Sequence, residues 1–244
     1  MEKLSTQLEK KVNRFRDDIT KGFGKSVVSI ILFGSAVTDE YHSGISDLNF
    51  LVVLKPKAMK DIYQARQWLS GWRRRKISLP LFVTESYIKA SLDSYPIEFL
   101  NMQSGYIVVQ GKDVLSGIKM SKKDLRLQIE RELKGKLLQL RQWMILTHGR
   151  KRALKMLVAR SIVTFTSIFK ALLFLRGKEI PGSKQAVILE TCREFKEIDE
   201  SLFSELLKMY HGSVKLSKNQ LEERVLKYIE QIQALSESVD QMKY

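Results

Sequence analysis

The chain has few of the residues that cross-link a protein or hold a structural metal. Its 244 residues include one cysteine, Cys192, and three histidines. A single cysteine excludes an internal disulfide framework, and the sequence shows no His and Cys cluster of the kind that binds zinc. We therefore expect a protein of the cytoplasm.

Long uninterrupted hydrophobic runs are also scarce. The first twelve residues, MEKLSTQLEKKV, lack the apolar core of a signal peptide. The longest apolar stretch, residues 158–175, is interrupted by Arg160, Lys170 and several Ser and Thr residues. Such a pattern is typical of a central bundle helix rather than a membrane span. The sequence predicts no membrane partner.

Acidic residues are in deficit. The chain has 27 Asp and Glu against 42 Lys and Arg, a net charge of +15 at pH 7. Residues 119–160 contain 13 Lys or Arg and 3 Asp or Glu, and residues 72–76 (WRRRK) form a second basic run. This excess favours an anionic partner, such as a triphosphate, RNA, DNA or an acidic protein, although a solvated basic surface explains it equally. Aromatic residues are thinly interleaved with the cations, so a base-stacking platform is not indicated.

A strand followed by a glycine turn stands out among the residues that are present. Residues 27–33, VVSIILF, form a short β-branched run closed by glycine, which predicts a buried strand. Gly34 allows the backbone to turn and to approach a ligand closely. Ser35 offers a hydroxyl and an amide to an anion. The turn is therefore a candidate phosphate site.

A second strand follows at residues 48–54, LNFLVVL. Side chains alternate between the faces of a strand, so Asp47 and Asn49 are expected on one face and Leu48 on the other. Residues two apart on one face are separated by roughly 6.5–7 Å at Cα. Two such side chains can converge on Mg²⁺, which prefers hard oxygen ligands. Asp39 and Glu40, in the spacer before this strand, are expected to be loop acids.

Residues 33–54, FGSAVTDEYHSGISDLNFLVVL, resemble the nucleotidyltransferase signature of the DNA polymerase β superfamily. That signature is an apolar residue, Gly-Ser, a spacer of about ten residues, and then Asp-x-Asp or Asp-x-Glu in a strand. Gly34, Ser35 and Asp47 match it, and Asn49 departs from it. The resemblance implies a nucleoside triphosphate (NTP) substrate near Gly34 and Ser35, and a Mg²⁺ or Mn²⁺ cofactor held by carboxylates.

The resemblance also implies a third carboxylate on a later strand. The best candidate is Glu98, in residues 95–102 (YPIEFLNM), which we interpret as part of a hairpin between residues 97–103 and 106–110. In the family, this third carboxylate is a metal ligand or the base that takes the acceptor proton. An exposed glutamate on an edge strand is the plainer interpretation of the same residue.

Asn49 leaves three alternatives open. An asparagine carbonyl can bind Mg²⁺, but the substitution removes one negative charge beside a metal-dependent phosphoryl transfer. The enzyme works with one metal held by Asp47 and Glu98, or it is slow, or it is an inactive relic. As a relic, the chain would be an antitoxin-like binding or regulatory module.

The period of hydrophobicity changes to helical beyond residue 121. The predicted helices are 121–149, 150–176, 184–194, 199–210 and 217–242, after residues 111–121, which resemble a linker. We therefore predict an α+β protein. It comprises a small mixed-sheet nucleotidyltransferase domain at residues 1–118 and an antiparallel helical bundle at residues 119–244. This arrangement resembles the aminoglycoside nucleotidyltransferases.

Two further hypotheses concern the bundle. In proteins of the resembled kind, the bundle closes over the nucleotide, which suggests Arg126, Lys134 or Lys136 as phosphate contacts; each is equally explained as a solvated helix residue. Arg141 and His148 match the Arg-x6-His motif of helical ribonuclease toxins. Basic residues at a helix end also bind its terminal carbonyls. The base of the nucleotide stays open, and so does the acceptor, for which the positive charge favours an anion such as RNA or a protein.

Overall fold

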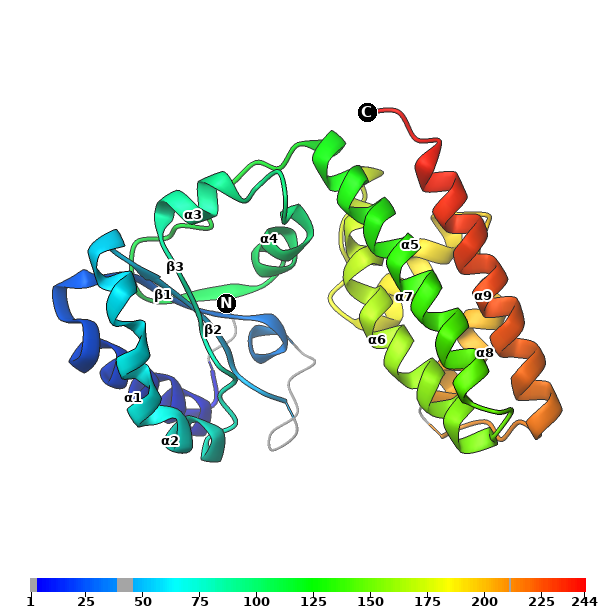
Figure 1. Cartoon of the computed structure of the whole chain (residues 1–244), viewed down its shortest axis with the longest axis horizontal. Helices are drawn as coiled ribbons and strands as arrows, with labels where there is room; N and C mark the ends of the chain where they lie inside the picture. The colour runs from blue at the N-terminus through cyan, green and yellow to red at the C-terminus, as the bar shows by residue number, and fades with distance from the viewer. Residues whose placement is uncertain (1–3, 39–45, 211) are drawn as a thin grey trace. The chain divides into compact units, whose positions relative to one another are not determined.

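The computed structural model describes residues 4–38, 46–210 and 212–244, so the spacer acids Asp39 and Glu40 lie outside the described residues. The chain divides into two compact units (Figure 1). The first unit comprises Met1–Asp93 with Glu98–Met120, and the second comprises Ser94–Ile97 with Ser121–Tyr244. The predicted domain boundary at residue 118 stays a prediction.

The elements of the amino-terminal half are α1 (Thr6–Phe23), η1 (Gly24–Ser26), β1 (Val27–Phe33), η2 (Gly34–Val37), β2 (Asn49–Leu54), η3 (Pro56–Trp68), α2 (Leu69–Arg74), β3 (Leu81–Val83), α3 (Glu85–Ala90), α4 (Pro96–Gln103) and β4 (Tyr106–Gly111). The described strands form a mixed sheet in the order β3-β2-β1-β4. Strand β1 is antiparallel to β2 and β4, while β2 and β3 are parallel. The predicted α+β class and both predicted strands around Gly34 are confirmed.

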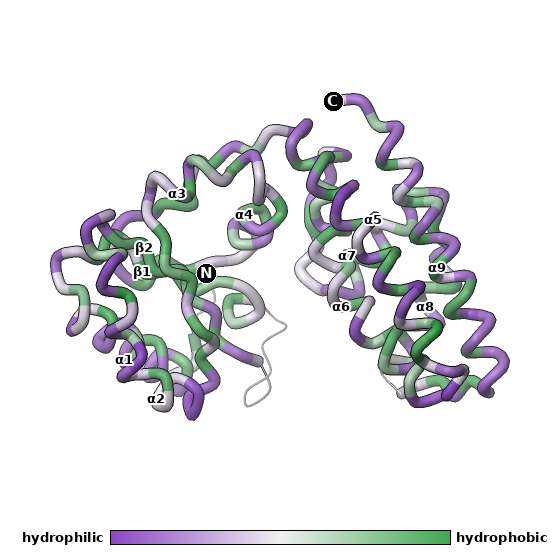
Figure 2. The backbone as a smooth tube through the Cα atoms, in the orientation of Figure 1, coloured by the Kyte–Doolittle hydropathy of each residue, from purple (hydrophilic) through white to green (hydrophobic). Residues whose placement is uncertain are grey.

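The sheet of the first unit is covered on both faces (Figure 1). Helices α1 and α2 cover one face, where Phe15 stacks on Phe50 with ring centroids 3.9 Å apart. Helices α3 and α4 cover the other, where Phe99 and Met102 pack with Leu51. Hydrophobic segments are accordingly concentrated in β1 and β2 (Figure 2). Because each face has its own core, alternate residues of β2 belong to different helix layers.

One prediction for this unit is wrong. Residues 97–103 were expected to be a hairpin strand but lie in helix α4. Proline suits the first turn of a helix. The spacing of the buried residues fits a helix as well as a strand; these residues are Ile97, Phe99, Leu100 and Met102. After β2, the chain forms the long 3-10 segment η3, which is followed directly by the short helix α2.

The predicted linker packs against the first unit. Leu115 is fully buried in the same core as Phe99 and Met102. The side-chain amide of Gln103 donates to the carbonyl oxygens of Leu115 at 2.8 Å and Ile118 at 3.2 Å. The segment after β4 is therefore irregular in backbone but fixed in position.

The second unit is helical. Its helices are α5 (Lys122–Leu146), α6 (Lys151–Leu175), α7 (Lys184–Glu194), α8 (Glu200–Tyr210) and α9 (Lys218–Asp240). Side chains of Ser121, Ser183 and Ser217 cap α5, α7 and α9. Helix α6 is long and apolar enough to cross a membrane by length and composition, but 61% of its most apolar window is buried within the protein. The burial identifies α6 as the core helix of this unit.

Candidate active site

The glycine turn at the end of β1 has a conformation that favours glycine. Gly34 has a φ of +81°, and its amide donates to the carbonyl of Gly105 at 3.3 Å. The carbonyl of Ser35 accepts from the backbone amide and the hydroxyl of Thr38, both at 3.2 Å. These bonds fix the turn between β1 and the segment that precedes β4. The half-buried Ser35 thus lies in a fixed turn, and its role as an anion contact stays a prediction.

Asn49 lies beside this turn. It is the cross-strand partner of Phe33, the last residue of β1. A Cβ atom at Gly34 would lie 3.3 Å from the Asn49 side-chain nitrogen. The Asn49 amide oxygen accepts a 2.7 Å hydrogen bond from the hydroxyl of Ser78. The close approach explains why a residue without a side chain precedes Ser35.

Asp47 is exposed just before β2. The next residue, Leu48, is fully buried on the α1 face, and its backbone is bonded to Lys76 and Ser78. Alternation along the strand therefore directs Asp47 and Asn49 to the opposite face, which α4 covers. The predicted sharing of one face by these two residues agrees with the burial of Leu48.

Glu98 is exposed on α4 rather than on a strand. The next residue, Phe99, and Met102 pack into the core on the face of the sheet that holds Asn49. Glu98 therefore belongs to the helix layer on the same side of the sheet as Asp47. The location on a strand was wrong, while its proposed role stays a prediction.

The donor chemistry of these residues suits one hard cation. Among residues 4–38, 46–210 and 212–244, no group of three His, Cys, Asp or Glu side chains is gathered in a metal-binding cluster. The ligands predicted from the sequence include two carboxylates, those of Asp47 and Glu98, and the Asn49 oxygen retains one lone pair beside its bond to Ser78. Magnesium prefers hard oxygen ligands and usually keeps several waters, so two carboxylates are a sufficient protein contribution.

Ser78 and Gly105 are site residues that the sequence did not indicate. The backbone carbonyl of Gly105 accepts a hydrogen bond from the Gly34 amide. The hydroxyl of Ser78 orients the Asn49 side chain. Ser78 lies directly after Ile77, which forms a parallel bridge with Leu48. The sequence could not indicate a role for Ser78, because its partner Asn49 is 29 residues away.

The basic residues suggested as phosphate contacts are engaged with acids of their own helix. Arg126 pairs with Glu130 at 2.9 Å, Lys134 with Glu130 at 2.5 Å, and Lys136 with Glu132 at 3.1 Å. Each pair is four residues apart on α5, where neighbouring charges attract. The plainer interpretation, a surface helix residue, therefore has direct structural support at all three positions.

The candidate nuclease pair is divided between two local roles. The guanidinium of Arg141 donates to the side chain of Gln233 on α9 at 2.6 Å. His148 follows the end of α5 with a φ of +49°, and its amide bonds to the Ile145 carbonyl. Both residues therefore act in the packing and termination of α5, which favours the structural explanation of the motif.

Comparison with known proteins agrees with this geometry. Residues 12–104 match the family model described as a nucleotidyltransferase domain. The first unit contains a nucleotidyltransferase domain. The matched range includes the glycine turn, β2 and α4, and therefore all five site residues of this domain predicted from the sequence, Gly34, Ser35, Asp47, Asn49 and Glu98.

A solved structure resembles most of the chain, including helices beyond the nucleotidyltransferase domain. It is the spectinomycin adenyltransferase AAD(9) from Enterococcus faecialis, crystallised with ATP and spectinomycin. The TM-score is 0.52 at 13% sequence identity, and the alignment covers 92% of this chain and 99% of that one. The likeness shows a shared fold, a nucleotidyltransferase sheet domain followed by a helical region. No curated protein matches the sequence.

Proposed function

We propose that the protein transfers a nucleoside monophosphate from an NTP to a hydroxyl group. The observation that supports this most directly is the position of the Asn49 side-chain nitrogen, 3.3 Å from where a Cβ atom of Gly34 would lie, within a nucleotidyltransferase domain. It puts a candidate phosphate cradle beside the strand that Asp47 precedes. The two halves of the sequence motif are thereby adjacent in space.

Each residue has a distinct role in the proposal. Ser35 holds phosphate oxygens through its amide and hydroxyl, and Gly34, whose own amide is bonded to Gly105, lets the backbone come close to the phosphate. Asp47 and Glu98 hold one divalent cation, Mg²⁺ or Mn²⁺, with the Asn49 oxygen as an additional ligand. When bound, this cation offsets the charge of the triphosphate. The protein contributes mainly position and electrostatics, as is usual for phosphoryl transfer.

The reaction forms one bond and breaks another. The acceptor hydroxyl gives its proton to Glu98, and its oxygen forms a bond to the α-phosphorus. The bond between that phosphorus and the bridging oxygen of the β-phosphate breaks, and pyrophosphate leaves with the electron pair. Glu98 is exposed, so it exchanges the proton with water afterwards.

The acceptor in this proposal is an anion such as RNA or a protein. The neighbour AAD(9) is crystallised with spectinomycin, whereas this chain has a net charge of +15. A surface of that charge attracts polyanions and repels polycations. We also place the protein in the cytoplasm, where nucleoside triphosphates are available.

The test is pyrophosphate release from each of the four common NTPs with Mg²⁺ or Mn²⁺. We expect one or more to be hydrolysed or transferred, and Asp47→Asn to reduce the rate by more than about a hundredfold. Asp61→Asn is the matched control, because Asp61 is an exposed acid of η3 in the same unit. Equal activity in the Asp47 and Asp61 variants would contradict the assignment.

The alternative of an inactive binding or regulatory module rests on Asn49 alone. Asn49→Asp discriminates between the two functions, because it restores the missing carboxylate with little change in shape. Turnover and metal binding that appear only in this variant would identify the native chain as a relic. If the native protein turns over NTP and the rate of the Asn49→Asp variant differs from the native rate by less than about tenfold, the site with Asn49 is a working one.

A further inference from the structure

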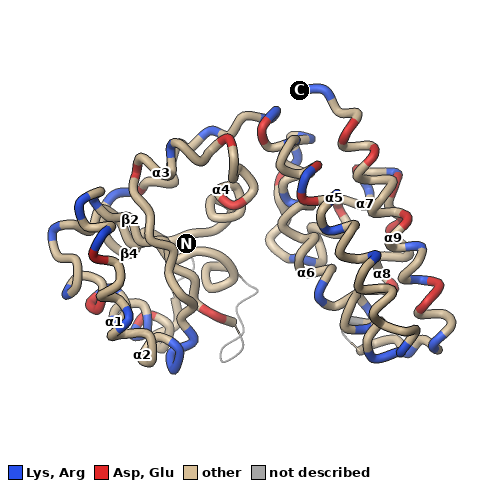
Figure 3. Tube along the Cα trace, in the orientation of Figure 1, with Lys and Arg blue, Asp and Glu red and all other residues tan. Residues whose placement is uncertain are grey.

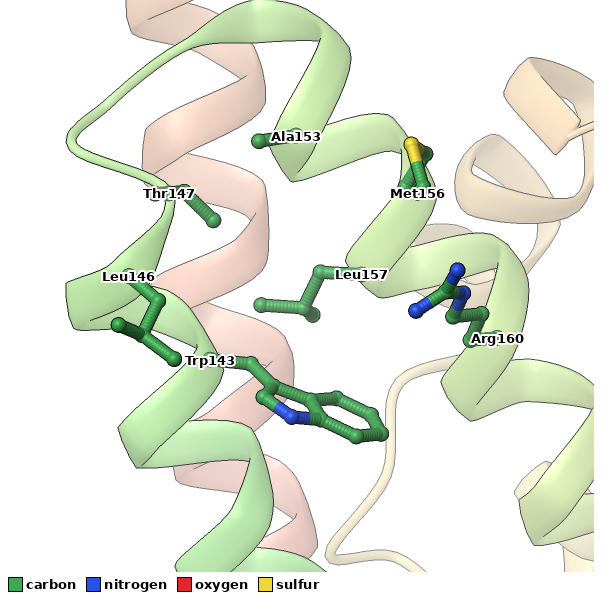
Figure 4. A pocket seen from close by; sticks show the side chains of 7 residues that line it. All are labelled: Trp143, Leu146, Thr147, Ala153, Met156, Leu157 and Arg160. Carbon is green, nitrogen blue, oxygen red and sulfur yellow. The ribbon is translucent and has the colours of Figure 1, made fainter.

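A cavity in the second unit provides a site that nucleotide transfer does not use. It has a volume of about 180 Å³ and opens between the end of α5 and the start of α6 (Figure 4). The side chains that line it are Trp143, Leu146, Thr147, Ala153, Met156, Leu157 and Arg160. The Trp143 indole and the Arg160 guanidinium extend toward this space from the two helices (Figure 4). The volume is that of roughly six water molecules.

The walls of this cavity are unusually exposed for apolar side chains. Leu146 is 63% exposed, Met156 is 44% exposed and Trp143 is 36% exposed. Leu157, by contrast, is buried and forms the floor. A ligand with an apolar body would cover surface that otherwise contacts water, which is favourable in proportion to the area covered.

The polar groups of the cavity that are available to a ligand are donors. Within the described parts of the chain, the Trp143 indole N–H and the Arg160 guanidinium have no hydrogen-bond or ion-pair partner. The Thr147 hydroxyl is engaged, since it donates to the Met144 carbonyl at 2.7 Å and accepts from the Gly149 amide at 3.2 Å. Indole and guanidinium groups cannot accept hydrogen bonds, so this set suits the oxygens of an anion.

The surrounding sequence reinforces the preference for negative charge. Residues 133–178 contain no Asp or Glu and eleven Lys or Arg. This span includes the carboxyl half of α5 and all of α6, and Figure 3 shows no acidic segment along α6. An anion at Arg160 therefore meets no nearby carboxylate of these helices, and the field of the whole segment attracts it.

We propose that the cavity between α5 and α6 binds a small organic anion, consisting of an aromatic or aliphatic body attached to a carboxylate or phosphate. The body packs against Leu146, Met156 and the Trp143 ring. The anionic oxygens accept from the Arg160 guanidinium. The site belongs to the second unit alone and is independent of the nucleotide chemistry.

Fluorine NMR of the protein labelled with fluorotryptophan provides the test. The chain has three tryptophans; Trp68 and Trp72 lie in the first unit and Trp143 in the second. The Trp143 resonance is assigned from its loss in Trp143→Phe. Three probes share a phenylpropyl body: phenylpropionate is an anion, phenylpropanol is neutral and phenylpropylamine is a cation.

We expect phenylpropionate to shift the Trp143 resonance alone, with a Kd on the order of 1 mM, and the alcohol and the amine to bind at least about tenfold more weakly. Arg160→Gln should weaken phenylpropionate about tenfold, because a hydrogen bond to a charged group is lost. Lys151→Gln is the matched control, since it removes one exposed charge of α6 outside the cavity and should change Kd by less than about twofold.

Four results would overturn the proposal. They are no Trp143 shift with phenylpropionate, equal binding of the alcohol or the amine, shifts confined to Trp68 and Trp72, and equal weakening by Lys151→Gln and Arg160→Gln. None depends on nucleotide turnover. Failure of this proposal is therefore distinguishable from failure of the proposed transferase function. A protein without turnover that binds phenylpropionate contradicts only the transferase, and a protein with turnover that does not bind it contradicts only this site.

Discussion

The hydroxyl of Ser78 donates a 2.7 Å hydrogen bond to the side-chain oxygen of Asn49. The Asn49 amide is thereby oriented with its oxygen toward Ser78 and its nitrogen toward the Gly34 turn, 3.3 Å from the position of a Cβ there. At the position where the resembled signature has a carboxylate, the N–H donors of Asn49 are directed toward the candidate phosphate cradle. In the proposed reaction, Asn49 in this orientation would donate a hydrogen bond to the triphosphate.

The Ser78–Asn49 bond should contribute measurably to stability. We expect Ser78→Ala to lower the free energy of unfolding by about 1 kcal/mol, since the half-buried amide oxygen loses its donor. A double-mutant cycle with Asn49→Ala, followed by urea unfolding, measures the coupling between the two residues. Effects that add to within about 0.3 kcal/mol would contradict the bond.

Gly34→Ala should destabilise the first unit by about 2 kcal/mol. Part of the cost is the φ of +81°, which disfavours a side chain, and part is the crowding of Asn49 at 3.3 Å. Gly117→Ala isolates the first part, because Gly117 has a φ of +75° and nothing within 4 Å of its Cβ position. Thermal unfolding should show a smaller loss of stability for Gly117→Ala than for Gly34→Ala. Equal losses would mean that the Asn49 side chain moves aside without an energetic cost.

Asp18 should be more important to stability than its neighbour Asp17. One Asp18 oxygen accepts from the indole N–H of Trp72 at 2.9 Å and from the guanidinium of Arg75 at 2.8 Å. Trp72 is buried, so Asp18→Ala leaves its N–H without a partner and should cost about 2 kcal/mol. Asp17→Ala removes an exposed carboxylate, 65% exposed, and should change urea unfolding by less than about 0.5 kcal/mol.

The single thiol should be inert in the folded protein. Burial, followed by the nearby charges of Glu200 and Asp199, raises the pKa of Cys192 from its ordinary 9.0 to about 12. Because the folded state binds this proton more tightly, its contribution to stability is present below pH 9.0 and is lost as the pH rises toward about 12.

Labelling with a thiol reagent checks the Cys192 prediction. Native protein near pH 9 should react at the rate of unfolding, while urea-unfolded protein should react at once. The pH dependence of unfolding above pH 9 should be weaker in Cys192→Ala. Rapid labelling of the native thiol, or an identical pH dependence in both proteins, would contradict the burial.

Local sequence was sufficient to predict the elements that end in a clear signal. The strand at residues 27–33 ends at Gly34, and the predicted helices at residues 184–194 and 217–242 begin in the structure after the capping residues Ser183 and Ser217. Their hydrophobic period and end residues agree with each other, so local propensity and packing favour one structure.

The prediction from sequence was wrong where a short apolar segment fits both the helical and the strand period of hydrophobicity. Residues 97–103 satisfy a strand and a helix alike, and the deciding factor is burial against Leu51 and Leu115, which lie elsewhere in the chain. Ser78 and the cavity between Trp143 and Arg160 were missed for a related reason. Each depends on side chains that become neighbours only when distant or antiparallel segments pack.

The attachment of residues 111–120 to the sheet domain has a practical consequence for anyone who separates the halves of this protein. Leu115, Ile118 and Met120 are all packed in the core beneath α4. Truncation after residue 118 would remove Met120 from this core and leave Ile118 at the exposed end of the chain. A stop codon placed after Met120, immediately before the Ser121 cap of α5, is the more promising design for producing the amino-terminal half.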